Sequence, residues 1–217
     1  MMDFEAARRK MVENQIRTRD VTAHSVLQAF LTVPRENFLS EKSKTIAYVD
    51  GDIQIAPGRY LMDASTLAKL LQLSAISKTD RVLEIGAGNG YAAALLANLA
   101  GSVVSIESDQ ALAAEAGEKL AALGYGNVKV VTGELEAGSR DGAPFDLILF
   151  NGSVEEVPPT LIDQMVEGGR LIAVIGYGNA AQATMMVRDQ GQVSASSHFN
   201  ASVKPLPGFR RAKEFVF

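Results

Sequence analysis

The sequence contains no cysteine and only two histidines among its 217 residues. The chain can therefore form no disulfide bond, no thiolate metal site and no cysteine nucleophile. The absence of cysteine is typical of proteins in a reducing compartment. His24 falls on a predicted surface helix and His198 in the C-terminal part of the chain. We interpret both as structural and expect no metal site.

Long apolar runs and an excess of basic charge are also absent. No apolar stretch approaches the roughly 18 residues that a membrane-spanning helix needs. The N-terminal "MMDFEAARRK" lacks the apolar core of a signal peptide. The net charge is −4 and the densest basic run is Arg8–Lys10, which does not indicate a nucleic-acid partner. With 47% hydrophobic and 21% charged residues, the composition predicts a soluble, cytoplasmic globular protein.

The first part of the chain, Asp3 to about Phe38, predicts two helices from its apolar spacing. We expect Thr22 to cap the second helix at its start and Pro34 to end it. A stretch of mixed character with turn signals follows. Asp63 is then expected to cap a short helix that carries several leucines.

From Arg81 onward, short apolar strands alternate with helices. The predicted strands are "RVLEIG", "SVVSIE", "NVKVVTG", "FDLILFNG" and "RLIAVIG", and the predicted helices are "YAAALLANLA", "DQALAAEAGEKLAALG" and "PPTLIDQMVEGG". The tail "TMMVRDQGQVSAS" predicts a hairpin and "AKEFVF" a terminal strand. This alternation predicts an α/β fold with a doubly wound, mostly parallel, Rossmann-like sheet. We expect one domain, 1–217, with an N-terminal helical extension (1–75) and a cofactor-binding core (76–217).

The turn "GAGNG" follows the first of these strands and opens a helix. In an open parallel sheet, ligands bind at the carboxyl ends of the strands. Gly86, Gly88 and Gly90 follow the pattern G-x-G-x-G, whereas a dinucleotide fingerprint would place its third glycine at Tyr91. The glycines alone are equally compatible with a tight turn that binds nothing.

Two carboxylates near this turn favour a particular ligand. Glu84 lies two residues before the first glycine, inside an apolar strand, where a buried carboxylate requires a partner. A pyrophosphate would repel it, whereas S-adenosylmethionine offers an ammonium and a sulfonium. Glu107 ends the next strand, where an acid can accept both hydrogen bonds of a ribose diol. The combination predicts S-adenosylmethionine as cofactor, with a nicotinamide cofactor as the weaker alternative.

These residues resemble a known family. "RVLEIGAGNGYAAALLANLAGSVVSIE" resembles motif I and the following strand of class I methyltransferases, and more particularly those of the protein-L-isoaspartate O-methyltransferases. "MVENQIRTRDVTAHSVLQAFLTVPRENFL", "AYVDGDIQI" and "PFDLILFNGSVEEVPPTLIDQMVEGGRLIAVIG" are similar to other segments of that family, so the likeness spans about residues 9–176. The resemblance implies methyl transfer from S-adenosylmethionine to the α-carboxyl of isoaspartyl residues in damaged proteins.

The resemblance also implies which residues bind the cofactor: Glu84, Gly86, Ala87, Gly88, Gly90, Glu107, Gly133, Glu134 and Asn151. Glu84 and the glycine turn would line its methionine end and Glu107 would hold its ribose. Gly133 and Glu134 would lie near the adenine, and Asn151 would border the reaction centre. The chemistry requires no general base, because a carboxylate acceptor is already ionised at neutral pH; the enzyme aligns the reacting atoms and excludes water.

The substrate loop departs from the family pattern. "LMDA" stands where the family has "ISQP", so Met62 takes the serine position and Asp63 the glutamine position. Met62 cannot donate a hydrogen bond to a carboxylate, and an ionised Asp63 at the acceptor site would repel one. Three further segments differ as well: "APGRY" replaces "GEGQT", "GEL" replaces "GDG" and "NGSVEEVP" replaces "TAAAP".

The leading hypothesis is an S-adenosylmethionine-dependent carboxyl methyltransferase of the isoaspartate-repair type, acting on a protein or peptide carboxylate. Met62 and Asp63 are the candidate residues on the acceptor side. Two alternatives stay open from the sequence. One is a methyltransferase with a different acceptor, and the other is a cofactor-binding or scaffold protein without catalysis. The sequence makes no prediction of the oligomeric state.

Overall fold

Seven strands form the central sheet, in the order β5-β4-β3-β6-β7-β8-β9. The structure, a computed structural model, describes residues 2–209. The strands are β3 (Arg81–Ile85), β4 (Ser102–Glu107), β5 (Val128–Thr132), β6 (Phe145–Val154), β7 (Met165–Ile175), β8 (Gln182–Asp189) and β9 (Gln192–Asn200). The first five of these are parallel, and β8 and β9 add an antiparallel hairpin. The predicted mostly parallel sheet and the predicted tail hairpin are confirmed, whereas "AKEFVF" lies outside the described residues.

The strand order reverses near the centre of this sheet. The chain runs outward through β3, β4 and β5 and then returns to place β6 against the free side of β3. Ligands of open parallel sheets bind at the carboxyl ends of the strands at such a reversal. The predicted glycine turn follows β3 directly, so the topology places it at this point.

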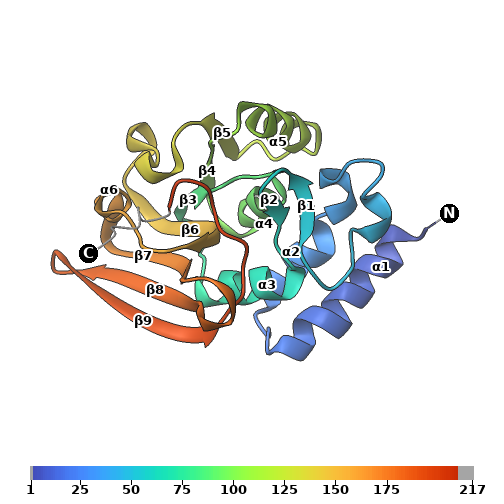
Figure 1. Cartoon of the computed structure of the whole chain (residues 1–217), viewed down its shortest axis with the longest axis horizontal. Helices are drawn as coiled ribbons and strands as arrows, with labels where there is room; N and C mark the ends of the chain where they lie inside the picture. Colours follow the sequence, from blue (N-terminus) through green and yellow to red (C-terminus); the bar gives the residue numbers. More distant parts are fainter. Residues whose placement is uncertain (1, 210–217) are drawn as a thin grey trace, which may run out of the picture.

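Six α-helices accompany the sheet in the described part of the chain: α1 (Phe4–Met11), α2 (His24–Thr32), α3 (Ala64–Leu73), α4 (Tyr91–Leu99), α5 (Gln110–Ala122) and α6 (Pro159–Ile162). A π-helical turn (Val12–Ile16) continues α1, and single 3-10 turns lie at Arg17–Arg19, Arg35–Phe38, Lys44–Ile46, Leu135–Ala137, Arg140–Gly142 and Gly178–Ala180. A separate two-stranded hairpin, β1 (Ile53–Ala56) and β2 (Arg59–Leu61), precedes α3. Figure 1 shows α1 to α3 gathered beside the sheet as the predicted N-terminal extension.

Each face of the sheet has its own hydrophobic core, because successive strand residues point to opposite faces. On one face, Val82, Leu147 and Ile172 pack with residues of the helices α1 to α5. On the other face, Leu83 and Ile148 pack with α6 and with the last described residues of the chain. Burial on both faces explains why the strands read as continuous apolar runs.

Two predicted helix boundaries are wrong. Helix α2 begins at His24 with Ala23 as its N-cap and without a side-chain cap, so Thr22 does not cap it. The backbone N–H groups of Thr22 (2.7 Å) and Ala23 (2.8 Å), just before the helix, donate instead to Oε1 of Gln72 on α3. The end of α2 is as predicted, since Val33 closes the helix just before Pro34.

The predicted helix over "PPTLIDQMVEGG" is also too long. Helix α6 stops at Ile162, because Met165 already pairs with Phe145 in the sheet. The next pair, Leu147 with Arg170, leaves extra residues in β7 that bulge out around Gly168, whose φ is +76°. Gly168 therefore lies in a strand bulge and does not end a helix.

Residues 201–209, the C-terminal strap, run back across the carboxyl end of β6. Ser153 of β6 forms two backbone hydrogen bonds with the strap. Its N–H donates to the Lys204 carbonyl (3.0 Å), and its carbonyl accepts from the Leu206 N–H (2.9 Å). Phe209 then stacks edge-on against Phe150 of β6, with ring centroids 5.5 Å apart. Figure 1 shows the strap as the dark red segment that follows β9 and passes β6. No element was predicted for these residues.

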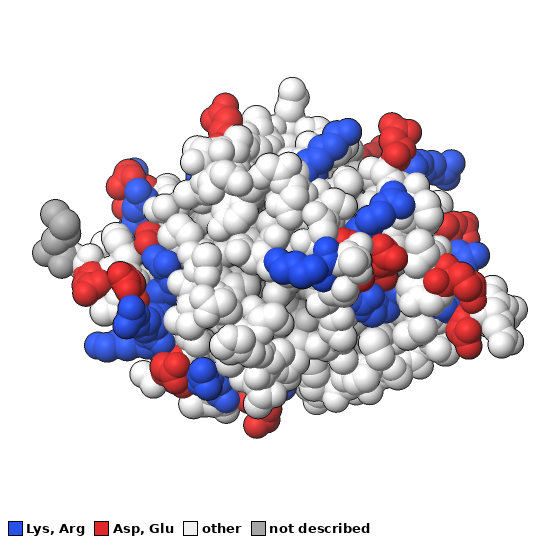
Figure 2. Space-filling view, turned by 180° about the vertical axis from the view of Figure 1, so that it is seen from behind, with Lys and Arg blue, Asp and Glu red and all other residues white. Residues whose placement is uncertain are grey.

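Surface charge is mixed in sign. On the face that Figure 2 shows, basic and acidic side chains are interspersed along the edges and near the middle, with uncharged surface between the groups. Between residues 2 and 209, no helix has both the length and the apolar character to cross a membrane.

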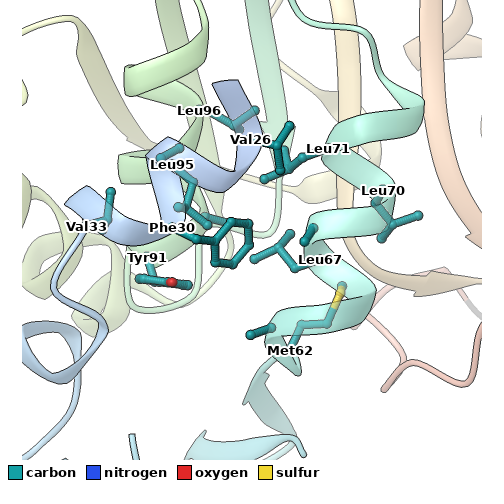
Figure 3. Packing of buried hydrophobic residues seen from close by; sticks show 14 of the residues in the cluster. Val26, Phe30, Val33, Met62, Leu67, Leu70, Leu71, Tyr91, Leu95 and Leu96 are labelled. Atoms are coloured by element: carbon teal, nitrogen blue, oxygen red, sulfur yellow. The ribbon is translucent and has the colours of Figure 1, made fainter. Parts of the chain in front are cut away.

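A buried arginine joins the N-terminal extension to the rest of the molecule. Arg35 has 0% of its surface exposed and donates to the carbonyls of Ala47 (2.8 Å) and Met62 (2.8 Å). Its guanidinium also lies 4.8 Å from the ring centroid of Tyr91, the first residue of α4. Burial lowers the pKa of Arg35. Figure 3 shows the apolar packing around Tyr91, where Phe30 of α2 meets side chains of α3 and α4.

We predict that Arg35→Met lowers the free energy of unfolding by about 2–5 kcal/mol, because two buried carbonyls lose their donor and the replacement fills the site imperfectly. Urea denaturation measures the change. Arg17→Met is the control, because Arg17 is half exposed and pairs only with Glu13 one turn away. Equal unfolding midpoints for the two variants would contradict the prediction.

Candidate functional site

The glycine turn, residues 86–90, lies between β3 and α4. Gly86, Gly88 and Gly90 have φ values of +89°, +55° and +88°, a region that side chains with a Cβ rarely adopt. The backbone N–H groups of Gly86 and Ala87 both donate to the Ile106 carbonyl, at 2.9 and 3.0 Å. These bonds fix the turn to the end of β4, so the ends of the two strands and the turn form one surface.

Gly90 has a different surrounding from the other two glycines. A Cβ on Gly90 would lie 3.2 Å from the Cβ of Ala116 and 3.3 Å from Leu120 Cδ1, both on α5. The absence of a side chain at Gly90 therefore lets α4 approach α5 closely.

Glu84 is completely buried at the centre of the sheet. Ser105, its register partner on β4, donates a hydrogen bond to Oε2. The Asn151 side-chain amide donates to Oε1 (3.1 Å) and also to the Gly86 carbonyl (3.2 Å). Burial raises the pKa of Glu84 to about 8, and the negative charge of Glu107 acts in the same direction, while the two hydrogen bonds oppose the shift.

Glu107, at the end of β4, is also completely buried. Its carboxylate accepts three backbone N–H groups, those of Gly88 (2.7 Å), Ser108 (2.9 Å) and Asp109 (3.1 Å). Arg59 of β2 adds two parallel bonds, from Nη1 to Oε1 (2.5 Å) and from Nη2 to Oε2 (2.6 Å). This bidentate pair is among the stronger side-chain interactions in proteins.

Leu206 of the strap covers the outer side of the glycine turn. Its side chain is buried, with 4% exposed. A Cβ built on Gly86 would lie only 2.6 Å from Leu206 Cδ2 and 3.4 Å from Arg59 Nη2. A Cβ on Gly152 of β6 would lie 2.7 Å from Leu206 Cγ. The two glycines therefore create the space that Leu206 fills.

The structure brings most of the predicted cofactor residues together. Glu84, Gly86 and Asn151 share hydrogen bonds, and Gly88 is bonded to Glu107. Ala87 and Gly90 belong to the same turn, and Gly133 and Glu134 lie just beyond β5. The Gly133 N–H donates to the Glu107 carbonyl (2.9 Å), whereas the Glu134 side chain is exposed.

The two residues predicted on the acceptor side differ in their surroundings. Met62 is buried, with 3% exposed, and Figure 3 shows it at the edge of the core near Leu67. Asp63 is the N-cap of α3, as predicted, because its Oδ1 accepts from the Thr66 N–H (2.9 Å) and from the Ser65 hydroxyl (2.7 Å). A role of Met62 and Asp63 in binding an acceptor stays a prediction.

A small cavity separates Met62 from the cofactor side. It has a free volume of about 10 Å³, room for about one water molecule. Its lining includes Arg59, Met62, Asn151, Lys204 and Leu206. A wider groove of about 360 Å³ adjoins it and shares Lys204.

Arg59, Lys204 and Leu206 are the residues that sequence reasoning missed. The only signal for Arg59 was its place in "APGRY", the segment that departs from the family's "GEGQT". Lys204 and Leu206 lie in a segment for which no element was predicted, so no pattern connected them with the glycine turn.

The donor set fits an adenosyl cofactor. Two buried carboxylates lie near the carboxyl ends of adjacent strands, beside a turn of positive φ. A carboxylate can pair with the cationic part of S-adenosylmethionine or accept the hydrogen bonds of its ribose diol. The space in front of the turn holds the side chains of Arg59 and Leu206. Within the described chain, no cluster of three or more candidate ligand side chains is suited to a metal ion.

Comparison with known proteins finds similarity over most of the chain. Residues 6–208 match the model of the family described as Protein-L-isoaspartate(D-aspartate) O-methyltransferase (PCMT). A protein-L-isoaspartate O-methyltransferase of Koribacter versatilis is 38% identical over 206 residues, covering 94% of this chain and 92% of that protein. A second, from Rhodopseudomonas palustris, is 42% identical over 179 residues, covering 82% and 73%.

Two solved structures are also similar. A protein-L-isoaspartate O-methyltransferase superposes with a TM-score of 0.82 at 27% identity, covering 93% of this chain and 66% of that chain, just under two thirds of its length. A Plasmodium falciparum protein assigned to PCMT, solved in complex with S-adenosyl-L-homocysteine, superposes with a TM-score of 0.78 at 19% identity. The second covers 95% and 99% of the two chains, and at that identity it shows the shared fold.

We predict that Glu84 makes the stability of the free protein fall as the pH rises. Its pKa of about 8 in the folded state exceeds the ordinary value of about 4.3. The stabilisation by the neutral acid is therefore complete below pH 4 and is lost between about pH 4 and 8. Relative to Glu84→Gln, the wild type should lose roughly 3–5 kcal/mol of unfolding free energy between pH 5 and pH 9.

Urea denaturation at the two pH values measures this difference. Glu118→Gln is the control, because Glu118 is exposed on α5 and its variant should follow the wild-type profile. Parallel pH profiles for the wild type and Glu84→Gln would show that Glu84 is charged throughout the range.

Proposed function

This chain belongs to the protein-L-isoaspartate(D-aspartate) O-methyltransferase family, and from this premise we propose that it methylates isoaspartyl residues. The methyl group comes from S-adenosylmethionine and the acceptor is the α-carboxylate of an isoaspartyl residue in a protein or peptide. One observation carries the proposal: Glu84 and Glu107 are buried near the carboxyl ends of adjacent strands, beside a glycine turn. A cytoplasmic location is part of the same proposal.

The residues proposed to hold the cofactor are Glu84, Gly86, Ala87, Gly88, Gly90, Glu107, Gly133, Glu134 and Asn151. Bound S-adenosylmethionine supplies an electrophilic methyl group. Glu84 faces its ammonium in this proposal. Because the pKa of Glu84 is raised to about 8, this carboxyl is ionised at neutral pH mainly when a cation lies beside it. Asn151 holds Glu84 in position through its amide.

The acceptor side requires placement of a carboxylate and no base, since the acceptor is already ionised at neutral pH. Met62 offers no donor there, and the Asp63 carboxylate is engaged as a helix cap. Lys204 provides the nearby positive charge. It lines both the small cavity with Met62 and the adjoining groove, and its ammonium lies 5.4 Å from the Tyr60 ring centroid. A cation at the mouth of a groove attracts an anionic acceptor.

The activity is tested with tritium-labelled S-adenosylmethionine and an isoaspartyl peptide. We expect methyl ester formation by the wild type and a loss of about a hundredfold or more in Glu84→Ala, because a charged contact to the cofactor is removed. The same peptide with ordinary aspartate is the substrate control and should give background counts. Cofactor binding without turnover of the isoaspartyl peptide would refute the repair activity.

Lys204→Ala should raise the KM for an isoaspartyl peptide about five- to tenfold and leave kcat within about twofold, because one exposed charge contributes roughly 1 kcal/mol to binding. Steady-state methylation at varied peptide concentration measures both constants. Lys10→Ala is the control, because Lys10 is an exposed lysine on α1. An unchanged KM would exclude Lys204 from acceptor binding.

A second candidate function has one observation in its favour. Arg59 and Leu206 fill the space in front of the glycine turn, as expected of a scaffold protein that has given up its cofactor. Calorimetry with S-adenosylhomocysteine separates the two, because a scaffold protein of this kind would release no heat of binding.

A further inference from the structure

Glu107 has no acceptor capacity left for a ribose. An ionised carboxylate offers about four lone-pair sites. Three backbone N–H groups and the two N–H groups of Arg59 already point at the two Glu107 oxygens, at 2.5–3.1 Å. A ribose diol would donate to the same two oxygens. The backbone donors belong to the glycine turn and to the start of α5 and cannot leave without rearranging both, so Arg59 is the donor that can leave.

Arg59 comes from an element that stands apart from the main sheet. Its hairpin, β1 with β2, forms a sheet of only two strands, and such a hairpin is marginally stable by itself. Gly58, with a φ of +69°, forms its turn, and Ile55 of β1 lies close to Gly88. A small displacement of this hairpin would therefore withdraw Arg59 from Glu107 without breaking any hydrogen bond of the seven-stranded sheet.

The strap provides a second occupant from an independent part of the chain. Leu206 fills the space beside Gly86 and Gly152 and is joined to β6 through Ser153. Arg59 and Leu206 both line the small cavity of about 10 Å³. Polar and apolar parts of the predicted cofactor site are thus filled by a guanidinium and an isobutyl group, respectively.

We propose that Arg59 competes with the cofactor's ribose for Glu107, so that the chain binds an adenosyl cofactor only in a conformation in which Arg59 has left this carboxylate. The inference rests on the proposed function, because it concerns access to the same site. Arg59 takes the glutamine position of the family's "GEGQT" segment. We call the conformation with Arg59 on Glu107 closed and the one without it open. The balance between the two sets the cofactor affinity, since the apparent Kd is the intrinsic Kd divided by the open fraction.

The test is calorimetric titration of the full-length protein with S-adenosylhomocysteine. Arg59→Gln, which restores the family residue, should bind at least about tenfold more tightly than the wild type. Arg59→Lys keeps the charge but cannot form two parallel bonds, so its Kd should fall between the other two. Arg17→Gln changes an exposed arginine in the same way and should leave the Kd unchanged. Thermal unfolding of each variant verifies that it is folded.

The outcomes separate this inference from the proposed function. If the wild type binds and neither Arg59 variant binds more tightly, Arg59 does not compete with the cofactor and the inference is overturned, while the proposed function stands. If the wild type, Arg59→Gln and the double variant Arg59→Gln/Leu206→Ala all fail to bind, both the inference and the proposed function are overturned. Should Arg59→Gln not fold, the comparison of Arg59→Lys with the wild type decides the inference.

Discussion

The carboxylate of Glu107 holds the carboxyl edge of the sheet together. It binds the glycine turn through Gly88, the start of α5 through Ser108 and Asp109, and the β1–β2 hairpin through Arg59. Three segments from different parts of the chain thus depend on one buried anion. Because a buried charge requires several partners, each of these segments is constrained by the position of the others.

The two buried carboxylates have different environments. Glu107 has a guanidinium as its counterion, whereas Glu84 has a hydroxyl and an amide as neighbours and, between residues 2 and 209, no cation in hydrogen-bond contact. The pKa of Glu84 is therefore raised to about 8. The two groups are coupled, because Glu107 raises the pKa of Glu84 and Arg59 lowers it. Withdrawal of Arg59 would make ionisation of Glu84 harder, unless another cation arrived beside it.

Much of the fold could be predicted because its signals are local. The alternation of apolar strands with helices indicates a parallel sheet, and the carboxyl ends of such strands meet at one edge. This rule alone brings Glu84, Gly86, Glu107 and Asn151 together from four separate positions. Asp63 was predictable as a cap because its acceptor needs only the N–H group of Thr66 three residues on.

The errors and omissions concern contacts between distant segments. Thr22 was predicted as a cap, but α2 has no side-chain cap, and the Thr22 N–H donates to Gln72 of another helix. Arg59 reaches Glu107 across 48 positions of the chain, and Leu206 reaches Gly86 from beyond the last strand of the sheet. No periodicity links such pairs, because their contact follows from the packing of elements and not from the local sequence.

Two of the departures from the family pattern lie side by side in one short segment. "APGRY" and "LMDA" follow each other in the sequence, and β2 (Arg59–Leu61) spans their junction. Its first residue binds Glu107, which is proposed to hold the cofactor, and its last residue is followed by Met62, which is proposed to face the acceptor. Arg35 holds the Met62 carbonyl in place, so this end of the segment is fixed to the core. A displacement of the hairpin that begins at the Gly58 turn would therefore free Glu107 and leave the Met62 end of the segment in place.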